Sequence, residues 1–135
     1  MAESLAEKNR GREMKTKGQL ESEISQAIVK FEKDYMGRGP VETRAFLIED
    51  MVLIRLRKVL TPAELKLASD DFPQRRALVK QVRHELLEHG RPLLEAAIHG
   101  ILDARVVSLH TDISTKTGER IIVFALDKAP EFQEK

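Results

Sequence analysis

Apolar residues recur every three or four positions in two long stretches of the chain, and every second position in four shorter ones. The first long stretch places six apolar residues on one side of a helix: Leu20, Ile24, Ala27, Ile28, Phe31 and Tyr35. This spacing predicts a helix over residues 19–36. Thr16 and Gln19 have the spacing of a capping box at its start, and Gly37 suits a left-handed residue at its end.

The second long stretch, residues 73–103, has one broad apolar sector. Its members are Leu78, Val79, Val82, Leu86, Leu87, Leu93, Leu94, Ala97, Ile98 and Ile101. A helix turns by about 100° per residue, so we expect this sector to face the core. Gly90 and Pro92 lie within the stretch. Because proline removes one backbone hydrogen bond, we expect a kinked helix, with two abutting helices as the alternative.

Four segments alternate with a period of two and predict strands over residues 43–49, 51–59, 105–113 and 120–127. Between the two strand pairs, Thr61, Pro62 and Glu64 are typical of the start of a short helix, over residues 62–69. The expected order is α-β-β-α-α-β-β. We predict an α+β two-layer sandwich, in which a four-stranded antiparallel sheet is covered on one face by the two main helices.

Composition places the chain among single globular domains. It has 135 residues, of which 41% are hydrophobic and 33% charged. We assign the domain to residues 18–128, with polar tails at 1–17 and 129–135. The absence of Cys excludes disulfides and thiolate chemistry. Residues 1–17 lack the apolar core of a signal peptide, and no window reaches the roughly 18 apolar residues of a membrane span, so we expect a cytoplasmic protein.

Charge and histidine spacing argue against several functions. The net charge is +1 and aromatic residues make up 4%, which disfavours a nucleic-acid partner. His84 and His89 are five positions apart, about 140° around a helix, so they do not share one metal ion. His110 and Asp112 share one strand face and can form a polar pair. We find no nucleophile–base pair, and we expect no metal, no cofactor and no enzymatic activity.

Arg83 interrupts the apolar sector of the long helix. Its guanidinium does not lose its proton, and an unpaired buried charge is costly. It can pair with an acid such as Glu64 or Asp112, bind the anionic group of a ligand, or extend to an edge of the core. We favour a structural ion pair.

The segment Gly37, Arg38, Gly39 and Pro40 is a candidate anion or partner site. Glycine lets backbone N–H groups approach an anion, and Arg38 supplies positive charge. The simpler interpretation is a helix stop and a turn into the first strand. The helix C-terminus that precedes this loop also repels anions through its dipole.

The order of several segments resembles the MpsC-like family of bacterial domains. These are residues 37–40 after an amphipathic helix, a hairpin, residues 60–64, Arg83, and residues 108–114 of the third strand. The resemblance covers roughly residues 19–127. The family is named after a sodium-translocating, membrane-potential-generating system whose other parts are linked to inorganic carbon uptake. The resemblance therefore implies an accessory role beside a membrane transport system.

The predicted sheet has one face that the two long helices do not cover. That face carries Leu53 and one of the two apolar rows of the fourth strand, either that of Ile121 and Val123 or that of Ile122. Contiguous exposed apolar surface usually marks an interface, so we expect a homodimer. The alternative is that the short helix or the N-terminal tail covers this face.

Two functional hypotheses follow. The first is an accessory or regulatory protein that acts by protein contact on components of a membrane transport system. The second is a cytoplasmic sensor that binds a small anion between Arg38 and Arg83. A metal-independent enzyme is a third and weaker option.

Overall fold

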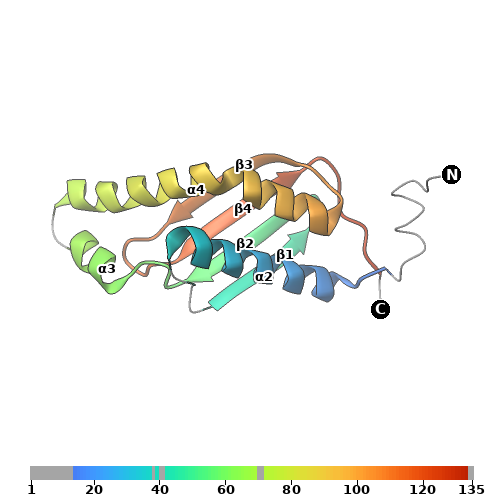
Figure 1. Ribbon diagram of the computed structural model, residues 1–135, viewed down its shortest axis with the longest axis horizontal. Coiled ribbons are helices and arrows are strands. Elements are labelled where there is room, and N and C mark those ends of the chain that lie inside the picture. Colours follow the sequence, from blue (N-terminus) through green and yellow to red (C-terminus); the bar gives the residue numbers. More distant parts are fainter. Residues whose placement is uncertain (1–13, 38, 40–41, 70–71, 134–135) are drawn as a thin grey trace.

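An antiparallel sheet of four strands forms one layer of the molecule, and two long helices form the other (Figure 1). The computed structural model describes residues 14–37, 39, 42–69 and 72–133. The elements are α2 (Lys17–Met36), β1 (Glu42–Ile48), β2 (Met51–Arg57), α3 (Pro62–Ala68), α4 (Pro73–Leu102), β3 (Val106–Ile113) and β4 (Arg120–Leu126). This confirms the predicted α+β class and the predicted element order.

The strand order is β1-β2-β4-β3, so β2 and β4 occupy the centre of the sheet. All three strand pairs are antiparallel. Leu53 stands opposite Phe46 on β1 and Val123 on β4, which fixes one outward-facing row. Of the two apolar faces of β4, the one with Ile122, Phe124 and Leu126 is buried and the one with Ile121, Val123 and Ala125 is partly exposed.

The core lies between the sheet and the two long helices. The sheet contributes Val52, Ile54, Leu56, Ile122, Phe124 and Leu126, and the helices contribute Leu20, Ile24, Ile28, Phe31, Val79, Leu87, Leu94 and Ile98. Gly90 lies where α4 meets α2. A Cβ at Gly90 would lie 2.6 Å from Cζ of Phe31, so this helix contact requires glycine.

The predicted helix starts are both present. Gln19 N–H donates to Thr16 Oγ1 at 3.2 Å, and Thr16 N–H donates to Gln19 Oε1 at 2.8 Å. Thr61 and Glu64 form the same reciprocal pair at the start of α3, at 3.1 and 2.8 Å. Gly37 ends α2 with a φ of 79°, as a left-handed cap requires. The element boundaries therefore follow local capping chemistry.

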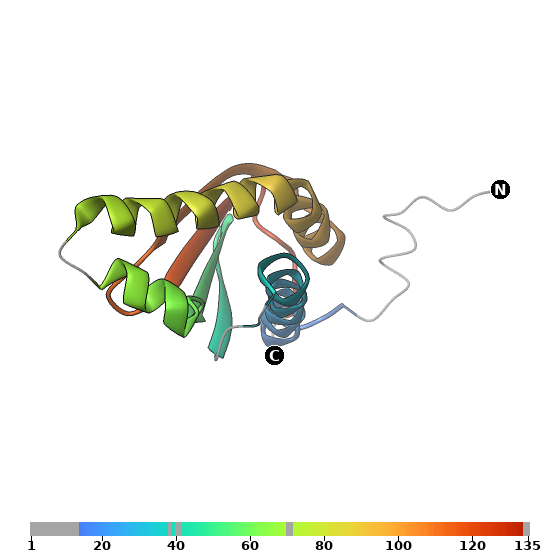
Figure 2. The ribbon, with the colours of Figure 1, turned by 60° about the vertical axis from the view of Figure 1, so that its left-hand side comes forward.

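Helix α4 agrees with one part of the prediction and differs from another. It runs unbroken through Pro92, as expected for one helix, and the alternative of two abutting helices is wrong. Figure 2 shows its axis changing direction towards the C-terminal end. The broad apolar sector is also only half buried: Leu78, Val82 and Leu93 are 55%, 47% and 57% exposed. The sheet and α2 cover only one side of the sector, so its other margin faces solvent.

The segment after β4 returns to the start of α2. Pro130 is buried, and Phe132 packs against the core. Gln133 N–H donates to the Lys15 carbonyl oxygen at 2.8 Å, next to a bridge between Thr16 and Gln133. Residues 129–133 were expected to form a polar tail. They contact the domain instead, because Pro130 and Phe132 are apolar and pack against it.

Candidate functional site

Arg83 forms a buried ion pair with Glu64. Arg83 is 4% exposed, and its Nε donates to Glu64 Oε2 at 2.8 Å. Its Nη2 donates to Glu64 Oε1 at 2.5 Å and to the Val59 carbonyl oxygen at 3.0 Å. This two-pronged contact links α4, α3 and the segment that follows β2. Of the two acids proposed as partners, Glu64 is the one in contact.

Electrostatics in this pair favour the charged carboxylate. Burial acts to raise the pKa of Glu64, but hydrogen bonds from Arg83 and Thr61, together with the Arg83 charge, hold that pKa below its usual value. The Glu64 side chain is 24% exposed, whereas that of Arg83 is 5% exposed. Water can partly solvate the Glu64 charge, so Arg83 depends more on the ion pair to compensate for the burial of its charge.

Two further charged residues are buried near this pair, and the sequence analysis missed both. Glu32 on α2 and Arg120 on β4 are each 3% exposed. Burial raises the pKa of Glu32, opposed by the charges of Arg120 and Arg83. Burial lowers the pKa of Arg120, an effect that Glu32 opposes and Arg83 reinforces. The alternation with a period of two places Arg120 on the same face of β4 as Ile122. This was the signal in the sequence that could have identified Arg120 as buried.

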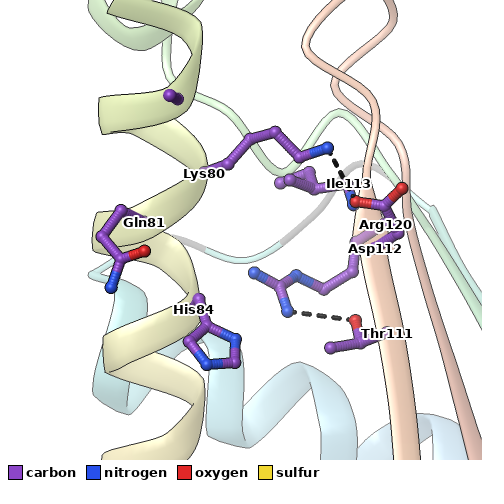
Figure 3. A pocket seen from close by; sticks show the side chains of 8 residues that line it. Lys80, Gln81, His84, Thr111, Asp112, Ile113 and Arg120 are labelled. Carbon is purple, nitrogen blue, oxygen red and sulfur yellow. Dashed lines mark hydrogen bonds and ion pairs between the residues drawn. The ribbon is translucent and has the colours of Figure 1, made fainter. Parts of the chain in front are cut away.

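A cavity of about 320 Å³ lies beside Arg120, between α4 and strands β3 and β4 (Figure 3). Its lining comprises Ala77, Lys80, Gln81, His84, Thr111, Asp112, Ile113 and Arg120. Arg120 Nη1 donates to Thr111 Oγ1 at 3.2 Å, and Lys80 Nζ lies 2.9 Å from Asp112 Oδ1. The wall therefore joins residues of α4 with residues of β3 and β4, which the sequence alone did not bring together.

Asp112 belongs to this cavity and not to Arg83, which corrects one of the two predicted partners. Its hydrogen bonds from Lys80 and from the Ile113 N–H hold the pKa of Asp112 below its usual value. Lys80 holds Asp112 at the side of α4 that faces β3, whereas Arg83 is held by Glu64 and Val59 where α4 meets α3.

The predicted pair of His110 with Asp112 is also replaced by another contact. His110 Nε2 lies 3.0 Å from Ser108 Oγ, two residues earlier on the same face of β3. Asp112 is held by Lys80 instead. In the segments that the structure describes, no group of three or more His, Asp or Glu residues is placed to hold a metal ion.

The predicted anion loop is only partly described. Gly37 forms the helix cap, and a Cβ on Gly39 would lie 3.2 Å from Lys33 Cε. Arg38 and Pro40 lie outside the described residues. Arg83, the second cation proposed for this site, already donates to Glu64 and Val59. These contacts support the structural interpretation of Arg83.

The outer face of the sheet carries the predicted interface residues Leu53, Ile121 and Val123, all partly exposed. Both long helices lie on the opposite side of the sheet (Figure 1), and α3 packs against α4. Neighbouring apolar positions of this face are Phe46, Ile48, Met51 and Ala125. Ile122 points inward and is 2% exposed, so the outward row of β4 is that of Ile121 and Val123.

Charged residues border this apolar face. The Arg44 guanidinium lies 5.5 Å from the centre of the Phe46 ring. Arg55 pairs with Glu119, at the end of the sheet where β4 begins. The face is therefore apolar around Phe46, Leu53 and Val123 and charged in the next row, where Arg55 lies between Arg44 and Ile121.

Comparison with known proteins identifies relatives of the whole domain. The family model described as Na⁺-translocating membrane potential-generating system (MpsC) matches residues 16–128. The uncharacterized protein YbcI of Bacillus subtilis (strain 168) is 43% identical over 112 residues, which are 83% of this chain and 89% of that protein. No solved structure matches the chain.

Proposed function

Because this chain belongs to the MpsC family, we propose that it is a non-enzymatic accessory protein of a Na⁺-translocating, membrane-potential-generating system and acts by protein–protein contact. It would work on the cytoplasmic side, at the periphery of the membrane components. None of the helices in the described segments has the length and hydrophobicity to cross a bilayer. The proposed role is one of binding and regulation.

The observation that carries this proposal is the open outer face of the sheet. Phe46, Leu53 and Val123 form one row across three strands, and neither long helix lies on this side of the sheet. Apolar positions in adjacent rows extend the same surface. A continuous apolar face of this kind is expensive to leave in water and usually marks an interface.

We propose that a second copy of the chain covers this face and that the dimer is the form that meets the transport system. A two-fold axis would set the same apolar centre of both copies in contact and place the charged margins at the rim. The short helix α3 was one alternative cover for this face of the sheet, but it packs on α4. The N-terminal residues 1–13 lie outside the described residues.

The second candidate function, a small-anion sensor that uses Arg38 and Arg83, has less support. The guanidinium of Arg83 is engaged by Glu64 on two nitrogens and by the Val59 carbonyl. An anion at Arg83 would have to displace the partly buried Glu64 carboxylate, which two nitrogens of Arg83 hold. Contact through the sheet face requires no such rearrangement.

A complementation experiment in the native host tests the accessory role. A deletion strain should lose much of its Na⁺-dependent membrane potential, measured with a voltage-sensitive dye, and the wild-type chain should restore it. Val123→Asp should fail to restore the potential because it places a charge in the sheet-face interface. Leu93→Asp, on the exposed side of α4, is the matched control and should restore it.

Two results would contradict the proposal. An unchanged membrane potential in the deletion strain would exclude the accessory role. Full restoration by Val123→Asp would exclude the sheet face as its contact surface. Circular dichroism of both purified variants checks that each retains the helical content of the wild-type chain.

A further inference from the structure

We propose that the cavity between α4 and the strands β3 and β4 binds a small oxyanion of the carboxylate, carbonate or phosphate class, with Arg120 as its main ligand. This site differs from the sheet-face contact described above. It also differs from the loop at residues 37–40, because Arg120 lies at the first residue of β4.

The backbone fixes the position of Arg120. Strand pairing sets it opposite Leu56 and Ile113, and alternation places it on the inner face with Ile122. Only 3% of the residue is exposed. A guanidinium keeps its charge at every physiological pH, so its burial is unfavourable unless an anion or a polar partner compensates for it.

The protein supplies Arg120 with few partners. Within the described residues, its one hydrogen bond is the donation from Nη1 to Thr111 Oγ1. Glu32 and Asp112 both act on Arg120 through their charges, but among the described residues neither forms an ion pair with it. A guanidinium has five N–H donors in a planar fork, so most of its hydrogen-bonding capacity is unused.

The unused donors of Arg120 face the cavity. Among the described residues, the one buried side-chain polar atom without a hydrogen-bond partner is Thr43 Oγ1, so the free nitrogens of Arg120 are not sealed inside the core. Figure 3 shows the guanidinium directed from β4 towards α4, across the space that the lining residues enclose. The planar fork can therefore meet an anion in two-pronged geometry.

The opposite wall complements this arrangement. Lys80 and His84 lie one turn apart on α4, and Gln81 adds an amide group. Lys80 and Arg120 are positive, whereas Asp112 is the one carboxylate in the lining, so the fixed charge of the wall is positive. Asp112 already accepts from Lys80 and would keep that cation at the rim.

The size of the cavity limits the ligand. About 320 Å³ is at the lower end of the range for small-molecule pockets, which begins near 300 Å³. A carboxylate, bicarbonate or inorganic phosphate fits this space. The lining also contains no Phe, Tyr or Trp on which the ring of a larger ligand could stack.

Titration of the full chain followed by ¹H–¹⁵N correlation spectra tests the proposal. Sodium phosphate, bicarbonate and acetate are added separately at constant ionic strength, with chloride as the reference anion. At least one should shift the amide signals of Thr111, Asp112 and Arg120 with a saturable dependence. The three arms identify which oxyanion class the site takes.

Variants complete the test. Arg120→Lys keeps the charge but loses the planar fork, and binding should weaken about tenfold or more. Arg91→Lys is the matched control: Arg91 lies on helix α4 outside the cavity, where it donates to Glu88 and Glu95, and its change should leave binding unchanged. The Lys80 side chain is 45% exposed, so Lys80→Met should not prevent folding. It therefore tests the opposite wall of the cavity even if Arg120→Lys does not fold.

The expected outcome is a saturable shift for at least one oxyanion that both Arg120→Lys and Lys80→Met weaken. Shifts no larger than those given by chloride for all three anions would overturn the proposal. Binding that is unaffected by both variants would also overturn it, because the anion would then lie elsewhere.

Discussion

At the scale of single residues, the two ends of the Arg83–Glu64 pair differ in their access to water. The Arg83 side chain is 5% exposed and that of Glu64 is 24% exposed. If Arg83 were removed, water could partly rehydrate Glu64. If the Glu64 charge were removed, a buried guanidinium would remain without a counter-charge. The cost of each single change should therefore be unequal.

We predict that Glu64→Gln lowers the free energy of unfolding at pH 7 by about 3 kcal/mol. Glutamine keeps the capping box with Thr61, so the change isolates the charge. The pKa of Glu64 is lowered by folding, hence its charge stabilises the protein above the unfolded pKa of about 4.3. The difference between wild type and variant should vanish as the pH falls through the folded pKa.

Denaturant unfolding at a series of pH values measures this difference. The double variant Glu64→Gln with Arg83→Met should lose less than the sum of the single changes, because it leaves no unpaired charge. The exposed pair Lys30 and Asp34 on α2 is the control, and its removal should show no such coupling. A difference for Glu64→Gln that persists unchanged at low pH would contradict the ion-pair account.

The sequence revealed one of the two buried arginines for a physical reason. Arg83 stands out because apolar residues surround it on a long helix, where the period is unambiguous. Arg120 stands at the first position of a strand, where the alternation has only begun. Its partner Thr111 and the facing Lys80 come from elements far away in the chain, so only the folded structure brings this site together.

At the scale of elements, helix α4 shows that apolar spacing predicts a face but not how much of it is covered. Leu94 is 2% exposed and the adjacent Leu93 is 57% exposed. Both belong to the sector predicted from the sequence. The number of covered positions depends on where α2 and the sheet end against the helix, which is a property of the packed molecule.

Two glycines of α4 provide a matched test of its contact with α2. Gly90→Ala should destabilise the protein by about 1–3 kcal/mol, because the new Cβ would overlap the Phe31 ring. That ring is buried and stacks on Tyr35, with 4.8 Å between the ring centres, so it has little room to move.

Gly100→Ala should stabilise the protein by about 0.5 kcal/mol, since no atom lies within 4 Å of its new Cβ and alanine favours the helix. Thermal unfolding of both variants measures the contrast. If Gly90→Ala were as stable as Gly100→Ala, the close approach of α4 and α2 would be wrong.

At the scale of the whole molecule, the fold was accessible from the sequence because its signals are local. Capping boxes at Thr16 and Thr61, and alternating strands, each need only a few neighbouring residues. The strand order was not predicted, because the pairing of β2 with β4 joins segments far apart in the chain. The contact of residues 129–133 with the start of α2 was not accessible, because it joins the two ends of the described chain.

The central claim also concerns the whole molecule: the open sheet face is a contact surface between two copies of the chain. Its apolar rows were predicted from Leu53, Ile121 and Val123, and the structure leaves both long helices on the other side of the sheet. Whether this surface is occupied in solution determines how the chain can meet a membrane-bound partner.

Light scattering coupled to size exclusion, at micromolar concentration, tests this claim most directly. We predict a mass near twice the 15.4 kDa of one chain for the wild type and for Leu93→Asp. Val123→Asp should give the mass of one chain with unchanged helical content, because a charge in the interface prevents association. A wild-type mass of 15.4 kDa would contradict the account.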